Sequence, residues 1–270
     1  MGEHPILDVW QADETFELGP ELASPATLKV TTIFASWRAD LIRQSLTNEP
    51  GTLARNYVDY YGRLYGEATE LSPMEVEDDL EANEIRTVER YSLAQPWLRK
   101  PDSDEYEFGP ADDLFANQLT TSRGGSARRW PIDMGIPRRL AWTTTMHLPQ
   151  SVTVGAWDRA YDVPGIGVTS THDQVDGGEG RVIRLRRTVS VERRFLPASE
   201  AEAYFDLRDA ALRTAGVTVS HLALDGRFQA PRGTPELGIG PWLMTYGWRV
   251  VAILVVLNGL RMLLSALGAG

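Results

Sequence analysis

The chain has 270 residues, 43 % of them hydrophobic, and a net charge of −10 at pH 7. This length and composition predict a globular protein with a sizeable core, in one large or two ordinary domains. The acidic balance argues against a nucleic-acid partner, because neutralising phosphates requires a dense Lys/Arg surface. Without cysteine, the chain offers no disulfide, no thiolate metal ligand and no Cys nucleophile. Its N-terminus has no basic stretch followed by an apolar core, so we expect no secretory signal peptide there.

The N-terminal part predicts strands followed by a helix. Residues 1–26 are interpreted as a lead-in with one strand, closed by Gly19-Pro20 and Pro25. The segment TLKVTTIF then alternates with period two and predicts a half-buried strand, whose inward side chains are Leu28, Val30, Thr32 and Phe34. A helix is predicted in SWRADLIRQSL, with Ser36 as its N-cap and an apolar stripe of Trp37, Leu41 and Ile42.

A second helix is predicted from about residue 52 to residue 65. Tyr57, Tyr61 and Tyr65 recur every four residues, so they lie on one side of it. Such a stripe is most often packed in a core, and we favour that interpretation. The alternative is an aromatic binding surface, which requires Tyr57 or Tyr61 to be exposed.

Strand patterns resume after the helices. Residues 67–77 and 84–93 predict two strands that are joined near Asp78-Asp79 and Asn83, and the acidic segment PDSDEYEFGPADD predicts a loop. The clearest strand is LAWTTTMHL, whose alternation predicts a buried face made of Leu140, Trp142, Thr144, Met146 and Leu148.

The segment RVIRLRRTVSVERRF predicts another strand, with an interrupted apolar side. That side holds Ile183, Leu185, Val189, Val191 and Phe195. Arg187 and Arg193 fall in the apolar phase, so we expect an edge strand or a β-bulge here.

A last helix is predicted over residues 199–214, where Ser199 and Glu202 have capping-box spacing. The whole pattern predicts an α+β fold, predominantly antiparallel β and sandwich-like, with helices near 36–66 and 199–214. We expect it to form one mostly β domain over residues 1–225, followed by a linker over residues 226–240.

No complete catalytic or metal-ligating set can be assembled from the sequence. The four histidines share no metal-ligand spacing; they are His4, His147, His172 and His221. The segment HDQVDGGEG places Asp173, Asp176 and Glu179 around glycines, but it matches no full calcium motif, and we favour a solvated hairpin tip. Phosphate-binding glycine loops and a Gly-x-Ser-x-Gly elbow are also absent from the sequence. We therefore assign no catalytic, cofactor-binding or metal-binding residue, and we expect no cofactor.

The order of the segments resembles a known family. VTTIFASWRADLIRQSL, with Ala39, Asp40 and Arg43, precedes the tyrosine-bearing helix and an acidic strand pair that ends near Glu89 and Tyr91. SARRWPIDMGIPRRLAWTTTMHLP then supplies Arg and Pro before a sheet and a Leu-Pro that closes a strand. Over about residues 5–225, this order resembles the region downstream of the catalytic core in bacterial transglutaminase-like multidomain proteins, those with an N-terminal domain of unknown function.

The resemblance implies an accessory role. The papain-like Cys, His and Asp triad of that family lies upstream of this region, and this chain has no cysteine. We therefore expect a non-catalytic interaction domain that positions or docks a transglutaminase-like module. Two alternatives stay open. One is a free-standing extracytoplasmic binding module, and the other is a hydrolase that uses acids such as Asp40, Asp173 or Asp176.

The C-terminal segment predicts a membrane anchor over residues 241–268. Between Val250 and Leu267 the residues that are not apolar are Asn258, Gly259, Arg261 and Ser265. A helix over this stretch measures roughly 27 Å, and a start near Trp242 brings it to the ~30 Å of a hydrocarbon core. Trp242, Tyr246 and Trp248 would then form an interfacial aromatic belt. The alternatives are an amphipathic helix on a membrane surface or partner, and a buried helix of a soluble fold.

The anchor also bears on partners and location. Asn258, Arg261 and Ser265 are three and four residues apart, so they share a helical face that suits a partner helix. Arg249 favours a cytoplasmic N-terminal flank. The resemblance implies instead that the domain is periplasmic or extracytoplasmic, which we slightly favour. The expected partners are thus the membrane and a protein, and not nucleic acid.

Overall fold

The computed structural model describes residues 6–99, 105–110, 130–149, 153–156, 159–163, 165–176, 180–214 and 217–222. The chain divides into two units, Met1–Phe228 and Gln229–Gly270, and all described residues belong to the first. The predicted linker and the predicted helix over residues 241–268 lie outside the described part. Within the described part, no helix combines the length and the apolar character needed to cross a membrane.

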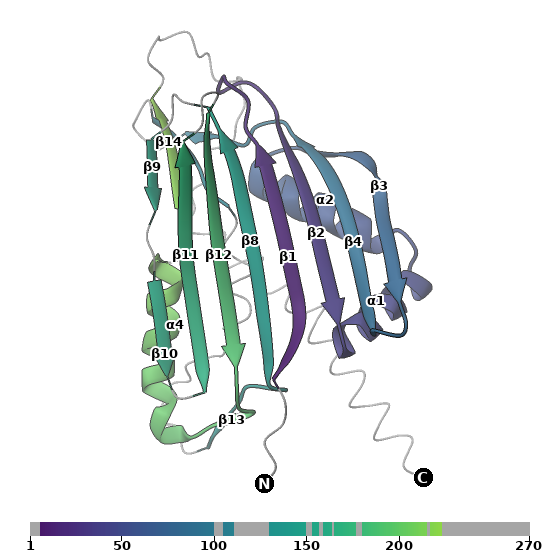
Figure 1. The fold of residues 1–270 in the computed structure, drawn as a ribbon, viewed down its shortest axis with the longest axis vertical. Helices are drawn as coiled ribbons and strands as arrows, with labels where there is room; N and C mark the ends of the chain where they lie inside the picture. Colours follow the sequence, from purple (N-terminus) through teal and green to yellow (C-terminus); the bar gives the residue numbers. More distant parts are fainter. Residues whose placement is uncertain are drawn as a thin grey trace. The chain divides into compact units, whose positions relative to one another are not determined.

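An eight-stranded sheet forms the frame of the fold (Figure 1), in the order β10-β11-β12-β8-β1-β2-β4-β3. Its strands are β1 (Leu7–Glu17), β2 (Ala26–Ala35), β3 (Ala68–Asp79), β4 (Glu84–Leu93), β8 (Arg138–Leu148), β10 (Arg159–Val163), β11 (Ile166–Asp176) and β12 (Arg181–Val191). Strands make up most of the regular structure in the described part, and three α-helices accompany them. The fold is therefore mainly β and of the predicted α+β class.

The pairing of β1 with β8 is parallel, whereas every other neighbouring pair in this sheet is antiparallel. The predicted antiparallel pattern therefore misses one pair. Parallel neighbours need a long crossover connection, and here the connection contains the elements between β1 and β8. The strand predicted as a lead-in thus lies in the middle of the sheet, between β2 and β8.

Two smaller sheets accompany the large one. β5 (Leu98–Arg99), β6 (Glu105–Phe108), β14 (Val217–Leu222) and β9 (Thr153–Ala156) form a four-stranded sheet, and β7 (Ile132–Asp133) pairs with β13 (Phe195–Leu196). The prediction of a loop in this segment is wrong at β6, which is a strand with Tyr106 and Phe108 buried. A strand of only four residues is too short to give a clear periodic signal in the sequence. Phe108 packs on Phe16 of β1, with ring centroids 5.1 Å apart.

Helices α1 (Trp37–Asn48) and α2 (Thr52–Tyr65) lie behind the sheet in the view of Figure 1. Ser36 occupies the predicted N-cap position of α1 but makes no side-chain cap bond, and Leu41 is 40 % exposed rather than packed. Gly66 ends α2 with a φ of +82°, where a Cβ atom would lie 3.3 Å from Gln95 Cβ. The third helix, α4 (Ala201–Thr214), follows a 3₁₀ turn, η1 (Ala198–Glu200).

The tyrosine stripe of α2 packs in the core, as we favoured from its spacing. Tyr61 and Tyr65 are 3 % and 4 % exposed, and Tyr57 is partly buried against the same cluster. The alternative of an exposed aromatic binding surface on this helix is therefore wrong.

The two faces of the large sheet differ in burial. On one face, which we call the covered face, alternate side chains of each central strand are buried. On the other, the open face, the alternating side chains of the same strands are mostly half-buried or exposed. The core lies between the covered face and the elements packed on it, namely α1, α2, α4 and β6.

The prediction of an edge strand or bulge around Arg187 is wrong. β12 lies between β11 and β8, and its pairing with both neighbours runs without a register shift. Arg187 stays in the buried phase and is 0 % exposed. Phe195, expected on the same apolar side, lies beyond β12 in β13 and is 53 % exposed.

Candidate functional site

A row of polar side chains crosses the covered face at mid-height. Its members are the buried polar and charged residues of the described part, namely Ser170 of β11, Arg187 of β12, Thr144 of β8, Glu14 of β1, Thr32 of β2, and Thr87 and Glu89 of β4. We call this row the polar band. It spans the six adjacent strands β11, β12, β8, β1, β2 and β4, each of which contributes at least one member.

The strand register places some members of the band directly opposite each other. Ser170 lies opposite Arg187, and Glu14 lies opposite Thr144 across the parallel pair. Glu14 and Glu89 face the same residue of β2, Val30, from its two sides. Two strand spacings therefore separate the two glutamates, about 10 Å between backbones.

Hydrogen bonds link the centre of the band into a chain. The Nη2 of Arg187 donates to Thr144 Oγ1 over 3.2 Å, and Thr144 Oγ1 donates to Glu14 Oε2 over 2.8 Å. The Tyr61 hydroxyl of α2 donates to Glu14 Oε1 over 3.4 Å. The guanidinium of Arg187 also lies 4.9 Å from the ring centroid of Trp142. A buried cation and a buried carboxylate are thus connected through one threonine hydroxyl.

Glu89 has its own donors at the other end of the band. Thr87 Oγ1 donates to Glu89 Oε1 over 2.9 Å, and the Tyr91 hydroxyl donates to Glu89 Oε2 over 3.1 Å. Ser170, at the opposite end, has a buried hydroxyl without a hydrogen-bond partner in the described part.

The band divides the core into two apolar clusters. The tryptophan cluster contains Trp10, Phe34, Leu140, Trp142, Ile166, Val168, Val189, Val191, Tyr204 and Phe205, among others. The tyrosine cluster contains Phe16, Leu28, Val30, Tyr61, Tyr65, Tyr91, Phe108, Met146, Ile183 and Leu185, among others. Along β8, for example, Trp142 belongs to the first cluster, Thr144 to the band and Met146 to the second.

Burial dominates the electrostatics of the band. It raises the pKa of Glu89 to about 7, with repulsion from Glu14 and Glu70 adding to the effect and the Thr87 and Tyr91 hydrogen bonds opposing it. Burial also raises the pKa of Tyr61, and the Glu14 carboxylate raises it further. Near neutral pH, both the protonated and the ionised form of Glu89 are therefore populated.

Two further cations, Arg38 and Arg138, border the tryptophan cluster. Arg38 of α1 lies 5.8 Å from the ring centroid of Trp10 and 5.3 Å from that of Trp37. Burial, together with the charge of Arg138, lowers the pKa of Arg38 to about 10. Arg138 donates to the carbonyl oxygens of Met134 and Ile136 over 2.7 and 3.1 Å. These arginines hold α1 and the start of β8 against the cluster.

The band contains acid–base groups, but they do not reach solvent. Glu14 is 5 % exposed and Glu89 is 2 % exposed. A general acid or base must lie within hydrogen-bond distance of its substrate, directly or through one water. In the described arrangement the two carboxylates accept hydrogen bonds from neighbouring side chains of the core.

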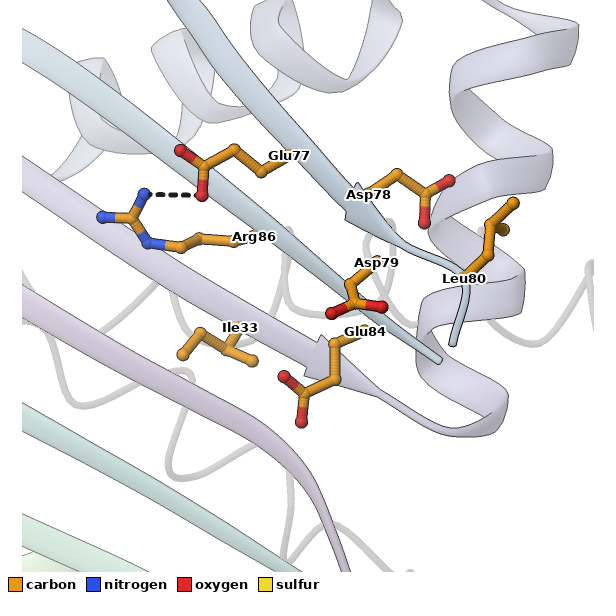
Figure 2. A pocket seen from close by; sticks show the side chains of 7 residues that line it. All are labelled: Ile33, Glu77, Asp78, Asp79, Leu80, Glu84 and Arg86. Atoms are coloured by element: carbon orange, nitrogen blue, oxygen red, sulfur yellow. Dashed lines mark hydrogen bonds and ion pairs between the residues drawn. The ribbon is translucent and has the colours of Figure 1, made fainter. Parts of the chain in front are cut away.

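The described surface also has an acidic hollow, at the β3–β4 turn (Figure 2). Its volume is about 520 Å³, and its lining residues are Ile33, Glu77, Asp78, Asp79, Leu80, Glu84 and Arg86. Three of its acids have partners: Glu77 pairs with Arg86 at 3.0 Å, Asp78 with Arg43 at 2.8 Å, and Asp79 accepts the backbone N–H of Ala82 at 2.9 Å. Among the described residues there is no group of acids and histidines able to hold a metal ion.

The residues weighed from sequence for chemistry are dispersed. His147 lies on the open face, 3.6 Å from Glu17, and His172 lies on β11. His221 belongs to β14, whereas His4 and Glu179 lie outside the described residues.

The acids of the hydrolase alternative do not come together. Asp173 lies on β11, the strand that also contains Asp176. It pairs with two arginines of β12, Arg186 at 2.5 Å and Arg184 at 3.9 Å. Asp40 is on α1, where it pairs with Arg43 at 3.0 Å. The described structure therefore offers Asp40 and the acids of β11 no common site of the kind that a hydrolase would need.

The motif residues that carried the family resemblance have structural roles. Ala39 is fully buried where α1 meets the sheet, and Arg43 joins α1 to Asp78 and Asn83 of the β3–β4 turn. Glu89 and Tyr91 are hydrogen-bonded to each other at the end of the polar band. These positions therefore fasten the helices and the β3–β4 hairpin to each other.

Sequence reasoning missed Glu14, Thr144 and Arg187 as one unit. A signal was present for two of them: Glu14 falls in the apolar phase of β1 between Ala12 and Phe16, and Arg187 falls in that of β12. A charged residue in a buried phase predicts a buried partner. The partner could not be named, because it depends on the parallel pairing of β1 with β8.

Comparison with protein-family models matched no family, and comparison with curated proteins found no significant match.

We expect Thr144→Val to destabilise the protein by about 2–4 kcal/mol, because it removes the hydroxyl between a buried guanidinium and a buried carboxylate. Thr145→Val is the matched control: it lies next on the same strand but faces the open side, and should change stability by less than about 0.5 kcal/mol. Urea unfolding measures both. Equal effects of the two substitutions would contradict the role assigned to the band.

We expect Glu89 to make stability depend on pH. Its pKa is about 7 in the fold against a usual 4.5, so its contribution is fully present below about pH 4.5 and is lost as the pH rises through about 7. Relative to Glu89→Gln, the wild type should lose on the order of 3 kcal/mol across this range. Urea unfolding at several pH values measures the difference. The control for the loss of a carboxylate is Glu77→Gln, at an exposed position of β3. If the free energy of unfolding of the wild type differs from that of Glu89→Gln by the same amount at every pH, the prediction is contradicted.

Proposed function

We propose that this chain is a non-catalytic, membrane-anchored accessory domain that docks a transglutaminase-like module on the open face of its large sheet. The observation that carries the proposal is the unequal burial of the two sheet faces. One face is covered by helices and β6, whereas the other presents a polar surface that extends across the central strands.

The chemistry of the open face suits a separable protein partner. Threonines from neighbouring strands meet there, as in the hydrogen bond between Thr169 of β11 and Thr188 of β12. Charged side chains are largely paired within the face, for example Arg186 with Asp173 and Arg90 with Glu75. A non-obligate interface is about as polar as the rest of a protein surface, so such a face can both stay in water and bind.

The buried state of the carboxylates favours docking over hydrolysis. Glu14 and Glu89 are the acids that the fold brings into one layer, and both lie under the tyrosines of α2. The hydrogen bond from Tyr61 to Glu14 holds α2 on the sheet, and Glu89 accepts its bonds within β4, so both carboxylates have a structural use. The family resemblance agrees with an accessory domain that leaves catalysis to its partner.

Membrane attachment is assigned to the apolar segment over residues 241–268, on the basis of its length and its flanking aromatic residues. The face with Asn258, Arg261 and Ser265 would then meet a partner helix. We place the domain on the extracytoplasmic side, as the family resemblance implies.

The docking surface is tested by photo-cross-linking in the native membrane. A benzophenone amino acid at Thr143, in the centre of the open face, should capture a protein that contains a Cys-His-Asp core. The same group at Asp59, which is exposed on α2 and away from this face, should not. Identification of the adducts by mass spectrometry decides the matter. Equal capture from both positions, or capture only of proteins without such a core, would sink the proposal.

The anchor is tested by membrane partition. We expect the full chain to resist carbonate extraction and a version that ends at Pro235 to be released, because only the former contains the apolar segment. Protease protection of the full chain in sealed vesicles reports the side on which the domain lies. Release of the full chain by carbonate would overturn the anchor.

A further inference from the structure

Strand β3 ends the large sheet, and its outer side has no strand beside it in the described part of the protein. The sheet order places β3 next to β4 alone (Figure 1). An edge strand directs every second backbone N–H and C=O group away from its neighbour, so these groups can bond to an added strand. The strand at the other end of the sheet, β10, has five residues, whereas β3 has twelve. β3 therefore offers the longer edge.

Only the second half of β3 keeps a regular register with β4. The register shifts between Glu70 and Ser72 and again between Ser72 and Glu75. Pro73, which has no N–H to donate, lies within this stretch, so the first half is poorly suited to a further strand. From Glu75 to Asp79 the five residues pair with β4 in sequence, and all five are exposed. We call this segment the acidic edge, and it is the part of β3 that a further strand can join.

The acidic edge lies in a segment with a single sign of charge. Residues 67–84 contain eight acids and no Lys or Arg. Three of these acids pair with Arg43, Arg86 and Arg90. The other five have no arginine partner among the residues that the structure describes, so this edge of the sheet has an excess of negative charge.

Opposite charges alternate from strand to strand on the open face at this edge. Arg86 of β4 pairs with Glu77 of β3 at 3.0 Å, as Figure 2 shows, and Arg90 pairs with Glu75 at 2.6 Å. Side chains of a strand added beyond β3 would lie next to the same two glutamates. Unlike charges on neighbouring strands stabilise a sheet, and like charges opposite each other destabilise it. A strand added here should therefore be cationic on this face.

The other face of the acidic edge offers an apolar contact. Val76 lies opposite Thr87, a buried residue of the covered face, yet Val76 is 41 % exposed. The elements that pack on the covered face thus leave Val76 partly uncovered. An apolar side chain of an added strand could contact it, because successive side chains of a strand point to opposite faces. The matching strand therefore alternates cationic and apolar residues.

A second copy of this chain is a poor match for the acidic edge. Four of its five residues are acidic. Two copies of β3 side by side would place acids next to acids, whether the strands ran parallel or antiparallel. Charge complementarity therefore favours a basic segment over self-association.

We propose that the acidic edge binds an extended basic segment of a partner protein, which joins the large sheet as a strand beyond β3. Backbone hydrogen bonds would supply affinity, and alternating cationic and apolar side chains would supply specificity. This inference uses neither the membrane segment nor the docking proposed for the open face, so it can fail or succeed without them.

The test measures binding of a synthetic peptide to the full chain in a non-ionic detergent. The probe is a fluorescent peptide of alternating arginine and valine, and the control peptide has the same composition with the arginines and valines in two blocks. We expect fluorescence anisotropy to show that the probe binds on the order of tenfold more tightly than the control, because only the probe matches both faces of the edge. Equal binding of the two peptides, or no binding of the probe, would overturn the proposal.

Methylation of the peptide backbone separates strand addition from simple charge attraction. In one probe all valine N–H groups are methylated, and in another all arginine N–H groups. Only every second N–H of an added strand faces β3, so one of these probes should lose affinity on the order of tenfold and the other should bind nearly as before. Equal affinity of the two methylated probes would contradict strand addition.

Variants of the protein locate the binding site. Glu75→Gln combined with Glu77→Gln should weaken binding of the probe on the order of tenfold, since both carboxylates lie beside the added strand. The matched control is Glu21→Gln combined with Glu202→Gln, which removes the same charge at exposed positions outside β3 and should leave binding unchanged. Equal effects of the two double substitutions would show attraction to the net charge of the chain, and the acidic edge would be rejected as the site.

Discussion

Two carboxylates and one guanidinium lie in the middle of the covered face, and the fold depends on how they are satisfied. An isolated buried charge is strongly unfavourable, so Glu14, Arg187 and Glu89 stay buried only with their hydrogen bonds in place. Thr144 joins Arg187 to Glu14, and tyrosines of α2 and β4 supply donors to the carboxylates. The polar band therefore fixes the register of β12, β8 and β1 and the position of α2 on them, since the hydrogen bonds of Arg187, Thr144, Glu14 and Tyr61 cross between these elements.

The parallel pair of β1 and β8 follows from the same constraint. It brings Glu14, near the start of the chain, opposite Thr144, and it joins strands β1 to β4 to strands β8, β10, β11 and β12. Such a pairing has high sequence separation, and contacts of this kind slow folding. Because the covered face carries the band and both clusters, the open face is the one that we propose for binding.

Local sequence patterns predicted many of the elements but not their arrangement. The alternation of TLKVTTIF and LAWTTTMHL gave β2 and β8 with the correct faces, and the spacing of Tyr57, Tyr61 and Tyr65 gave α2 with its packed side. The same reasoning failed at Arg187, because it treats a charge in an apolar phase as an interruption and has no means of finding a distant partner. It also failed at Leu41 and at β6, where an amphipathic stripe and a loop were expected. For the candidate site, the Glu89–Tyr91 pair was noted as a motif, whereas its place in the band was not visible.

The sequence by itself determined the periodicities, the chain breaks, the absence of any thiol chemistry and the apolar C-terminal segment, because these depend only on neighbouring residues. The tertiary structure decided that the first strand is central and pairs in parallel, that Arg187 is in the core and that Glu14, Thr144 and Arg187 form one unit. Each of these facts is a contact between residues far apart in the chain, and such contacts are set by the packing of the whole sheet rather than by local preference.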